Sequence, residues 1–280
     1  GLSIFLMAMK SDLRAWQFFD KEGKKTSYED LVKSASKADI ILFGEQHNNP
    51  VCHWLQLQLV KDLYAEKGDE LVLGAEMFEA DNQLILDEYL EGRMKASNFE
   101  GDARLWKNYK TDYKPLLDFA AAHELQFVAT NIPRRYAAMV NGGGFEALDS
   151  LSATAKAYFA PLPMRYDSTL PGYKAMLDMG PEMKSHASAN LPKAQAAKDA
   201  TMAWFILQNW KKGQAFLHFN GTYHSDNFDG IVWHLLQENP DLKVLTISSV
   251  EQDTITDLSE ENLGLGDYIL CIPSDMTKTY

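Results

Sequence analysis

Two distant segments, residues 40–47 and 216–224, each run from an apolar stretch into the pattern Gly-x-x-His. Short apolar stretches of this kind are typical of buried strands. Glu45 and His47 lie two residues apart, so both side chains can reach the same side of an extended segment. A carboxylate and an imidazole in one place are able to transfer a proton or hold a ligand. We therefore expect His47 and His224 to face one shared site.

The next two apolar runs, residues 71–75 and 125–129, also lead directly into polar side chains. Glu76 follows the first run. Arg134 and Arg135 follow the second, after a proline that suits the first turn of a helix. Positive charges at a helix start oppose the helix dipole, so we interpret both arginines as aimed at an anion. The polar residues expected at the strand ends are Glu45, His47, Glu76, Glu79, Asn131, Arg134, Arg135, His218, Asn220 and His224.

Short apolar runs alternate with helical patterns along the chain, which is typical of βαβ units and a mostly parallel sheet. Thr26 and Glu29 form a capping-box pattern that predicts a helix start, and Pro50 predicts another. The expected strands cover residues 40–43, 71–75, 125–129, 214–219, 243–247 and 268–272, and later helices cover 193–210 and 226–237. We predict an α/β fold with helices on both faces of the sheet, which binds ligands beyond the carboxyl ends of the strands.

Residues 142–192 interrupt this alternation, because glycine, proline and aromatic residues are frequent there. We expect a helical or irregular insertion that caps a single domain of residues 1–280. Glu79 and Asn131, taken singly, are as readily explained by helix capping as by a site. The two Gly-x-x-His segments together favour a site.

Composition limits the possible functions. The 280 residues are 46% apolar and 24% charged, as in ordinary globular proteins, and the formal charge of −12 argues against a nucleic-acid partner. Cys52 and Cys271 are either small buried residues or a disulfide pair. Residues 2–9 are apolar but shorter than the roughly 20 needed to span a bilayer. They are the end of an export signal, a strand or an arm of the fold.

Several motifs resemble the ChaN-like haem-binding lipoprotein family, which is related to Tiki peptidases, TraB-like proteins and erythromycin esterases. The resemblance runs from about Phe19 to Leu235. The motifs are residues 43–50, residues 76–79 with Gln83, residues 113–116, residues 131–135 and residues 195–203. The relatives imply a site at Glu45, His47, Glu76 and His224, with an arginine from residues 133–135.

The resemblance implies an exported, periplasmic or outer-membrane lipoprotein that binds haem for iron uptake. Membrane tethering through a lipid and a homodimer are further expectations from the same resemblance. The chain departs from many members by carrying Tyr223 before the second histidine, where a phenol is able either to ligate ferric iron or to fill the haem space. No C-x-x-C-H motif for covalent haem attachment occurs in the sequence.

A haem site requires a tyrosine or histidine as axial ligand and cations for the propionates. Tyr109, Tyr113 and Tyr223 are the axial tyrosine candidates, in no fixed order. The residues expected to bind the cofactor are His47, Tyr113, Arg134, Arg135, His218, Asn220 and Tyr223.

The alternative is a metal-dependent or acid–base hydrolase, a peptidase or esterase. In it Glu45, His47, Glu76 and His224 hold a divalent metal ion or act as general base and acid. We also expect Glu45 and Glu76 at adjacent strand ends. One of them is then paired with Arg134 or Arg135 or has a raised pKa, because two close carboxylates resist joint ionisation.

Overall fold

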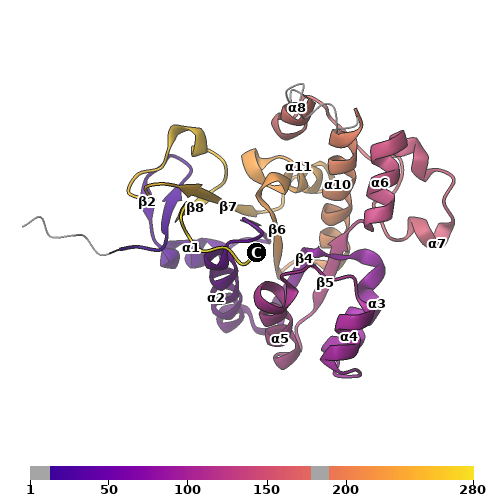
Figure 1. Ribbon diagram of the computed structural model, residues 1–280, viewed down its shortest axis with the longest axis horizontal. Coiled ribbons are helices and arrows are strands. Elements are labelled where there is room, and N and C mark those ends of the chain that lie inside the picture. The colour runs from indigo at the N-terminus through magenta and orange to yellow at the C-terminus, as the bar shows by residue number, and fades with distance from the viewer. Residues whose placement is uncertain (1–12, 178–188) are drawn as a thin grey trace, which may run out of the picture.

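The computed structural model describes residues 13–177 and 189–280, which form an eight-stranded sheet with helices on both faces (Figure 1). Its order is β2-β1-β8-β7-β3-β6-β4-β5. Every pairing from β8 to β5 is parallel, and only β1 and β2 run antiparallel to their neighbours. The strands are β1 (Gln17–Asp20), β2 (Lys25–Thr26), β3 (Ile40–Glu45), β4 (Leu71–Glu79), β5 (Phe127–Asn131), β6 (Ala215–Gly221), β7 (Val244–Gln252) and β8 (Tyr268–Pro273). The α/β fold and mostly parallel sheet expected from the sequence are confirmed.

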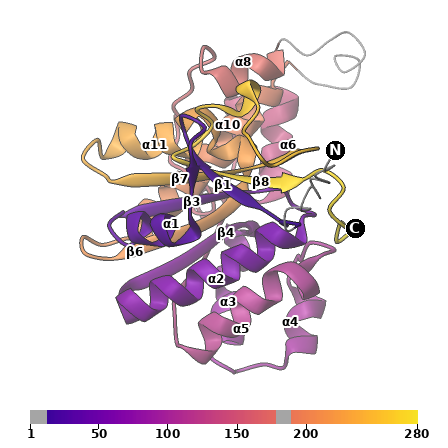
Figure 2. The same ribbon diagram turned by 90° about the vertical axis from the view of Figure 1, so that its left-hand side faces the viewer.

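Helices α2 and α5 cover one face of the sheet, and α10 and α11 cover the other (Figure 2). The helices are α1 (Tyr28–Ala35), α2 (Pro50–Lys67), α3 (Gln83–Leu90), α4 (Ala96–Asp102), α5 (Lys114–Ala122), α6 (Arg134–Gly143), α7 (Ala153–Lys156), α8 (Pro171–Leu177), α10 (Leu191–Asn209) and α11 (Ile231–Glu238). In the described part of the chain, no helix is long and apolar enough to cross a membrane.

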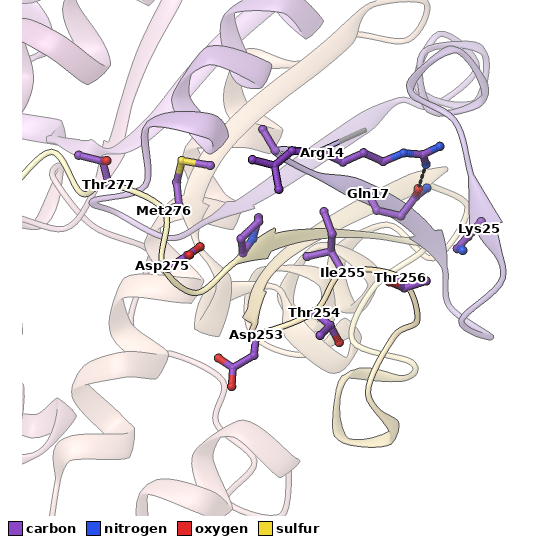
Figure 3. Close-up of a pocket in the computed structure, with 13 residues that line it drawn as sticks. Arg14, Gln17, Lys25, Asp253, Thr254, Ile255, Thr256, Asp275, Met276 and Thr277 are labelled. Carbon is purple, nitrogen blue, oxygen red and sulfur yellow. Dashed lines mark hydrogen bonds between the residues drawn. The ribbon is translucent and has the colours of Figure 1, made fainter. Parts of the chain in front are cut away.

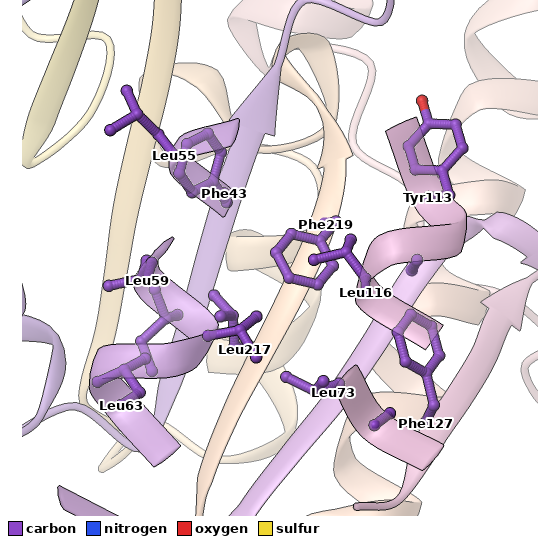
Figure 4. Close-up of a cluster of buried hydrophobic side chains, with 14 of the residues drawn as sticks. Phe43, Leu55, Leu59, Leu63, Leu73, Tyr113, Leu116, Phe127, Leu217 and Phe219 are labelled. Atoms are coloured by element: carbon purple, nitrogen blue, oxygen red, sulfur yellow. The ribbon is translucent and has the colours of Figure 1, made fainter. Parts of the chain in front are cut away.

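The central strand β3 is buried on both faces, which explains its unbroken apolar run. Ile41 and Phe43 pack toward α2, whereas Ile40 and Leu42 pack toward α10 and α11. Figure 4 shows the first cluster, in which aromatic and leucine side chains of β3, β4, β5 and β6 meet α2 and α5. Rigid packing on both sides fixes where the strands end, and therefore where the polar residues beyond them lie.

Some local expectations were wrong by a few residues. Ser27, not Thr26, caps α1, and it forms the capping box with Asp30. Thr26 ends β2, which was not expected because a two-residue edge strand has no readable periodicity. The expected helix over residues 226–237 begins only at Ile231, after three residues with positive φ, among them Asn227.

The expected insertion, residues 142–192, is described in part. Its helices α7 and α8 are short, and apolar side chains around Phe159 and Met164 pack on α6 and α10. The expectation for residues 2–9 lies outside the described residues. Cys52 and Cys271 are both buried and free, so they do not form a disulfide.

Gly44 allows the end of β3 to approach its neighbours closely. A Cβ there would lie 2.9 Å from the carbonyl oxygen of Ile247 and 3.1 Å from the Cα of Thr222. Both contacts are with backbone, which cannot rotate away. We expect Gly44→Ala to lower the free energy of unfolding by about 1–3 kcal/mol, as measured by urea denaturation.

Gly101→Ala is the matched control, because Gly101 lies exposed in α4 with no atom near the added Cβ. It should leave stability unchanged or raise it by up to about 1 kcal/mol. Equal stability of the Gly44→Ala variant and the wild type would show that β3 is not fixed at this point.

Candidate functional site

The carboxyl ends of β3, β4, β5 and β6 surround a pocket of about 330 Å³. His47 and His224 both line it, as expected from the two Gly-x-x-His segments. The lining residues are His47, Glu76, Glu79, Trp106, Asn131, Ile132, Arg134, Gln195, Lys198, Gly221, Tyr223 and His224. The pocket therefore collects polar residues from segments that are far apart in sequence.

Glu45 is buried behind His47 and orients it. Oε1 of Glu45 lies 2.9 Å from Nδ1 of His47 and accepts a hydrogen bond from the Tyr113 hydroxyl at 2.6 Å. Gln56 donates to the other oxygen at 2.6 Å. Burial raises the pKa of Glu45, but His53 and His47 outweigh burial and lower it below its ordinary value. Glu45 is therefore an ionised, fully bound carboxylate.

His47 presents its second ring nitrogen to the pocket. Asn108 donates to the His47 carbonyl oxygen at 2.9 Å, and the ring packs edge-on against Trp106. Burial lowers the pKa of His47, but Glu45 and Glu76 outweigh burial and raise it. The imidazole is thus held in place and favoured in its cationic form.

Gly221 makes room for this ring. A Cβ at residue 221 would lie 2.8 Å from Nε2 of His47 and 3.5 Å from an oxygen of Glu76. The Gly221 N–H donates to the same oxygen of Glu76 at 2.7 Å. The backbone at the end of β6 therefore lies between the side chains of His47 and Glu76 and is close to both.

His224 lies between two carboxylates. Its Nε2 is 3.2 Å from Glu76, and its Nδ1 contacts Asp199 of α10. Burial lowers the pKa of His224, but Glu76 and Asp199 outweigh burial and raise it to about 10. Burial likewise raises the pKa of Glu76, and the two histidines more than reverse this, so that it falls far below its ordinary range. His224 is an imidazolium at neutral pH.

Asp199 was not expected as a site residue from the sequence, although it is one of the two carboxylates that bind His224. It is fully buried, and Tyr173 of α8 donates to its second oxygen at 2.7 Å. Its only sequence signal is a single acidic residue, between Lys198 and Ala200, in a helix with many apolar residues and within the segment 195–203 that supports the family resemblance.

Glu45 and Glu76 do not lie at adjacent strand ends, because β6 lies between β3 and β4. Within the described residues, neither carboxylate pairs with an arginine. Arg135 binds Asp81 instead, at 2.6 Å, and Arg134 lines the pocket. The expectation of an arginine partner or a raised carboxylate pKa was wrong, because histidines provide the compensating charge.

His218 and Asn220 do not line the pocket. Both are fully buried, and His218 contacts Thr130 at 2.7 Å and Asn220 at 3.0 Å. Burial lowers the pKa of His218 to about 4, so this ring is neutral. Tyr113 is also sealed from solvent, with its hydroxyl bound to Glu45. Direct contact of these three residues with a cofactor is not possible in this arrangement.

Tyr109 and Tyr223 differ sharply in exposure. Tyr109 is buried and packs its ring against Phe78 and Phe99. Tyr223 lies at the pocket with 78% of its surface exposed, so it does not fill the interior.

The expected metal ligands Glu45, His47, Glu76 and His224 do not form a ligand set. Within residues 13–177 and 189–280, no group of three or more His, Cys, Asp or Glu side chains is arranged to hold a metal ion. Both ring nitrogens of His224 face carboxylates, which leaves no lone pair for a metal.

A larger cavity of about 690 Å³ lies elsewhere, along β1 and the chain after β8 (Figure 3). Arg14 there binds Gln17 at 2.8 Å, and no histidine is among the described residues that line the cavity. If size alone decided, this cavity would be the candidate functional site. The smaller pocket is the better candidate, because it contains the paired acids and histidines.

The shifted pKa of His224 predicts a pH dependence. Its folded pKa of about 10 exceeds the value of about 6.5 for an unfolded chain. Its stabilising contribution is therefore complete below about pH 6.5 and is lost as the pH rises through about 10. NMR of the ring signals should show a single titration near pH 10, and stability should fall over the same interval.

Asp199→Asn should lower the pKa of His224 by at least about one unit, because it removes one of two carboxylate partners. Asp118→Asn, at an exposed ion pair in α5, is the control and should leave the titration unchanged. A wild-type His224 that titrates near pH 6.5 would contradict the ion pairs described.

Comparisons with known proteins agree with this architecture. The structure of ChaN of Campylobacter jejuni, described with cofacial heme binding, is similar with a TM-score of 0.70 and 20% identity, over 92% of this chain and 97% of that one. A mutant of the erythromycin esterase EreC in its open conformation has a TM-score of 0.52 and 14% identity, over 93% of this chain and 98% of that one. At these identities the likeness establishes the fold alone.

A succinoglycan biosynthesis protein is also similar, with a TM-score of 0.53 and 13% identity, over 89% of this chain and 91% of that one. No curated protein matches the chain in sequence. The family described as "Haem-binding uptake, Tiki superfamily, ChaN" matches residues 31–235, which is most of the chain. The chain therefore belongs to the ChaN family of haem-binding uptake proteins in the Tiki superfamily.

Proposed function

We propose that this protein binds haem at the outer edge of the pocket, with Tyr223 as the axial ligand. The observation that carries the proposal is the exposed phenol: Tyr223 is 78% exposed and lies at the pocket. A tyrosine oxygen is an established ligand of ferric haem iron. The other two candidate tyrosines are buried and offer no access to a porphyrin.

The charges beside Tyr223 fit the haem periphery. Arg134 and Lys198 line the same pocket, and neither has a carboxylate partner in the described part of the chain. Cations of this kind pair with propionates. Haem, when bound, supplies an iron with axial positions, and the protein supplies the phenol and the surrounding charges.

Family membership supports a role in haem acquisition, and we propose that the protein is exported to carry it out. Cell fractionation of the full-length protein checks this, and recovery in the cytosol alone would contradict export. The family favours haem binding over hydrolysis by Glu45, His47, Glu76 and His224.

Haem binding predicts a specific effect of the Tyr223 hydroxyl. The wild-type protein should shift the Soret band of hemin at micromolar concentration. Tyr223→Phe should weaken binding by at least about tenfold and remove the tyrosinate features of the ferric spectrum, because the iron loses its oxygen ligand.

Tyr109→Phe is the matched control, since Tyr109 is buried away from the pocket. It should leave the spectrum unchanged. A Tyr223→Phe spectrum identical to that of the wild type would exclude Tyr223 as ligand, and a wild-type protein that leaves hemin unshifted would contradict haem binding.

A further inference from the structure

We infer that Trp106 is the wall against which the flat ring of a porphyrin packs, so that the site recognises the ring itself and not only its iron. The inference rests on the proposed haem binding and deepens it. That proposal assigns a ligand to the iron and cations to the propionates, but it assigns no partner to the apolar ring between them. A site that holds the ring takes porphyrins with or without a metal.

Trp106 provides the main apolar surface of the pocket. Among the described residues that line the pocket, Trp106 and Ile132 have the large apolar side chains, and Ile132 is only 1% exposed. Trp106 is partly exposed. Most of the other lining residues are charged or polar. A porphyrin ring is apolar over most of its area, so its binding is favoured by an apolar surface that covers it. Trp106 is therefore the side chain that such a ring would contact.

The loop after α4, which carries Trp106, is anchored before the indole. Arg104 donates from Nε to Glu79 at 2.9 Å, and its guanidinium also binds Asp81. The backbone N–H of Arg104 donates to the side-chain oxygen of Asn82 at 2.9 Å. Glu79 is the last residue of β4, so these bonds attach the loop to the carboxyl end of that strand.

The same loop is anchored again after the indole. Asn108 donates to the carbonyl oxygen of His47 at 2.9 Å. Nζ of Lys107 lies 3.7 Å from the centre of the Tyr280 ring, in a cation–π contact. Trp106 is therefore placed between residues that are bound to the rest of the site on both sides.

Ring contacts fix the indole itself. It packs edge-on against His47, with 4.9 Å between ring centres, and against Tyr113, with 6.1 Å between ring centres. Tyr113 is buried and donates to Glu45 at 2.6 Å, so it is not free to turn away. A side chain that is already ordered loses little conformational freedom when a ligand binds. Trp106 is thus a preorganised contact, as a binding residue requires.

Trp106 and Tyr223 line the same pocket from segments that are distant in sequence. A porphyrin whose iron reaches the phenol of Tyr223 therefore lies beside the indole, while Arg134 and Lys198 remain the partners of the propionates. The bond to Tyr223 requires iron, whereas packing on Trp106 does not. Iron-free protoporphyrin IX, which keeps the ring and both propionates, therefore separates the two contributions.

Fluorescence titration should show that the wild-type protein binds protoporphyrin IX. Trp106→Ala should weaken this binding by at least about tenfold, because the ring loses its apolar wall. Trp106→Phe keeps a flat aromatic side chain and should remain within about twofold of the wild type. With hemin, Trp106→Ala should also weaken binding, yet the tyrosinate features of the spectrum should remain, because the axial ligand is still present.

Trp54→Ala is the matched control. Trp54 is a 49% exposed tryptophan of α2 that packs on Trp16, and it is not among the described residues that line the pocket. Its removal should change neither affinity. Urea denaturation checks that each variant is folded. If Trp106→Ala is unfolded, Trp106→Leu takes its place, because leucine keeps an apolar side chain without the flat ring, and it should weaken protoporphyrin IX by at least about fivefold.

Equal affinity of the wild type and Trp106→Ala for protoporphyrin IX would overturn the inference, as would a loss of the same size in Trp54→Ala. Tyr223→Phe should weaken hemin much more than protoporphyrin IX. If Trp106→Ala weakens both porphyrins and Tyr223→Phe weakens neither, the ring contact is supported and only the proposed axial ligand is contradicted. A wild-type protein that binds neither porphyrin would contradict the proposed function and the inference together.

Discussion

The buried imidazolium of His224, held between Glu76 and Asp199, is the interaction on which the site depends. It joins β4, α10 and the turn after β6, three segments that are distant in sequence. Buried charges are costly unless they are paired, so each of these groups requires the other two. Tyr173 extends the arrangement to α8 through Asp199. The expected insertion thus contributes directly to the order of the pocket.

A second buried carboxylate, Glu45, lies on the other side of β6, and it too is stabilised by partners that bind its charge. Glu45 uses both oxygens to hold Tyr113, Gln56 and His47. The two histidines both line the pocket but differ in access, because the side chain of His224 is 6% exposed whereas that of His47 is 35% exposed. The buried polar groups at the base of the pocket are therefore held in place by their own hydrogen bonds and ion pairs.

The sequence predicted the strand ends well, and it predicted their lateral order poorly. Glu45 and His47 were recognised because an apolar run ending in polar residues is a local signal. The position of β6 between β3 and β4 has no such signal, because a parallel crossover is free to leave a gap for a later strand. The expected pairing of Glu45 with Glu76 failed for this reason.

Two further errors have different causes. His218 was interpreted as a site residue, yet strand alternation places it on the same face as Phe216, beneath α10. Asp199 was missed because a lone acid in a helix becomes informative only when its burial is known. The first error was avoidable from the sequence, and the second was not.

Gly221 shows how one residue of the site limits the choice of another. The backbone there has φ −61° and ψ 148°, a conformation open to any residue, so the need for glycine does not come from the chain. It comes from the imidazole of His47, which occupies the space of the missing Cβ. A side chain at residue 221 would therefore require the ring of residue 47 to move or to be absent. What fits in one Gly-x-x-His segment thus depends directly on the residue present in the other.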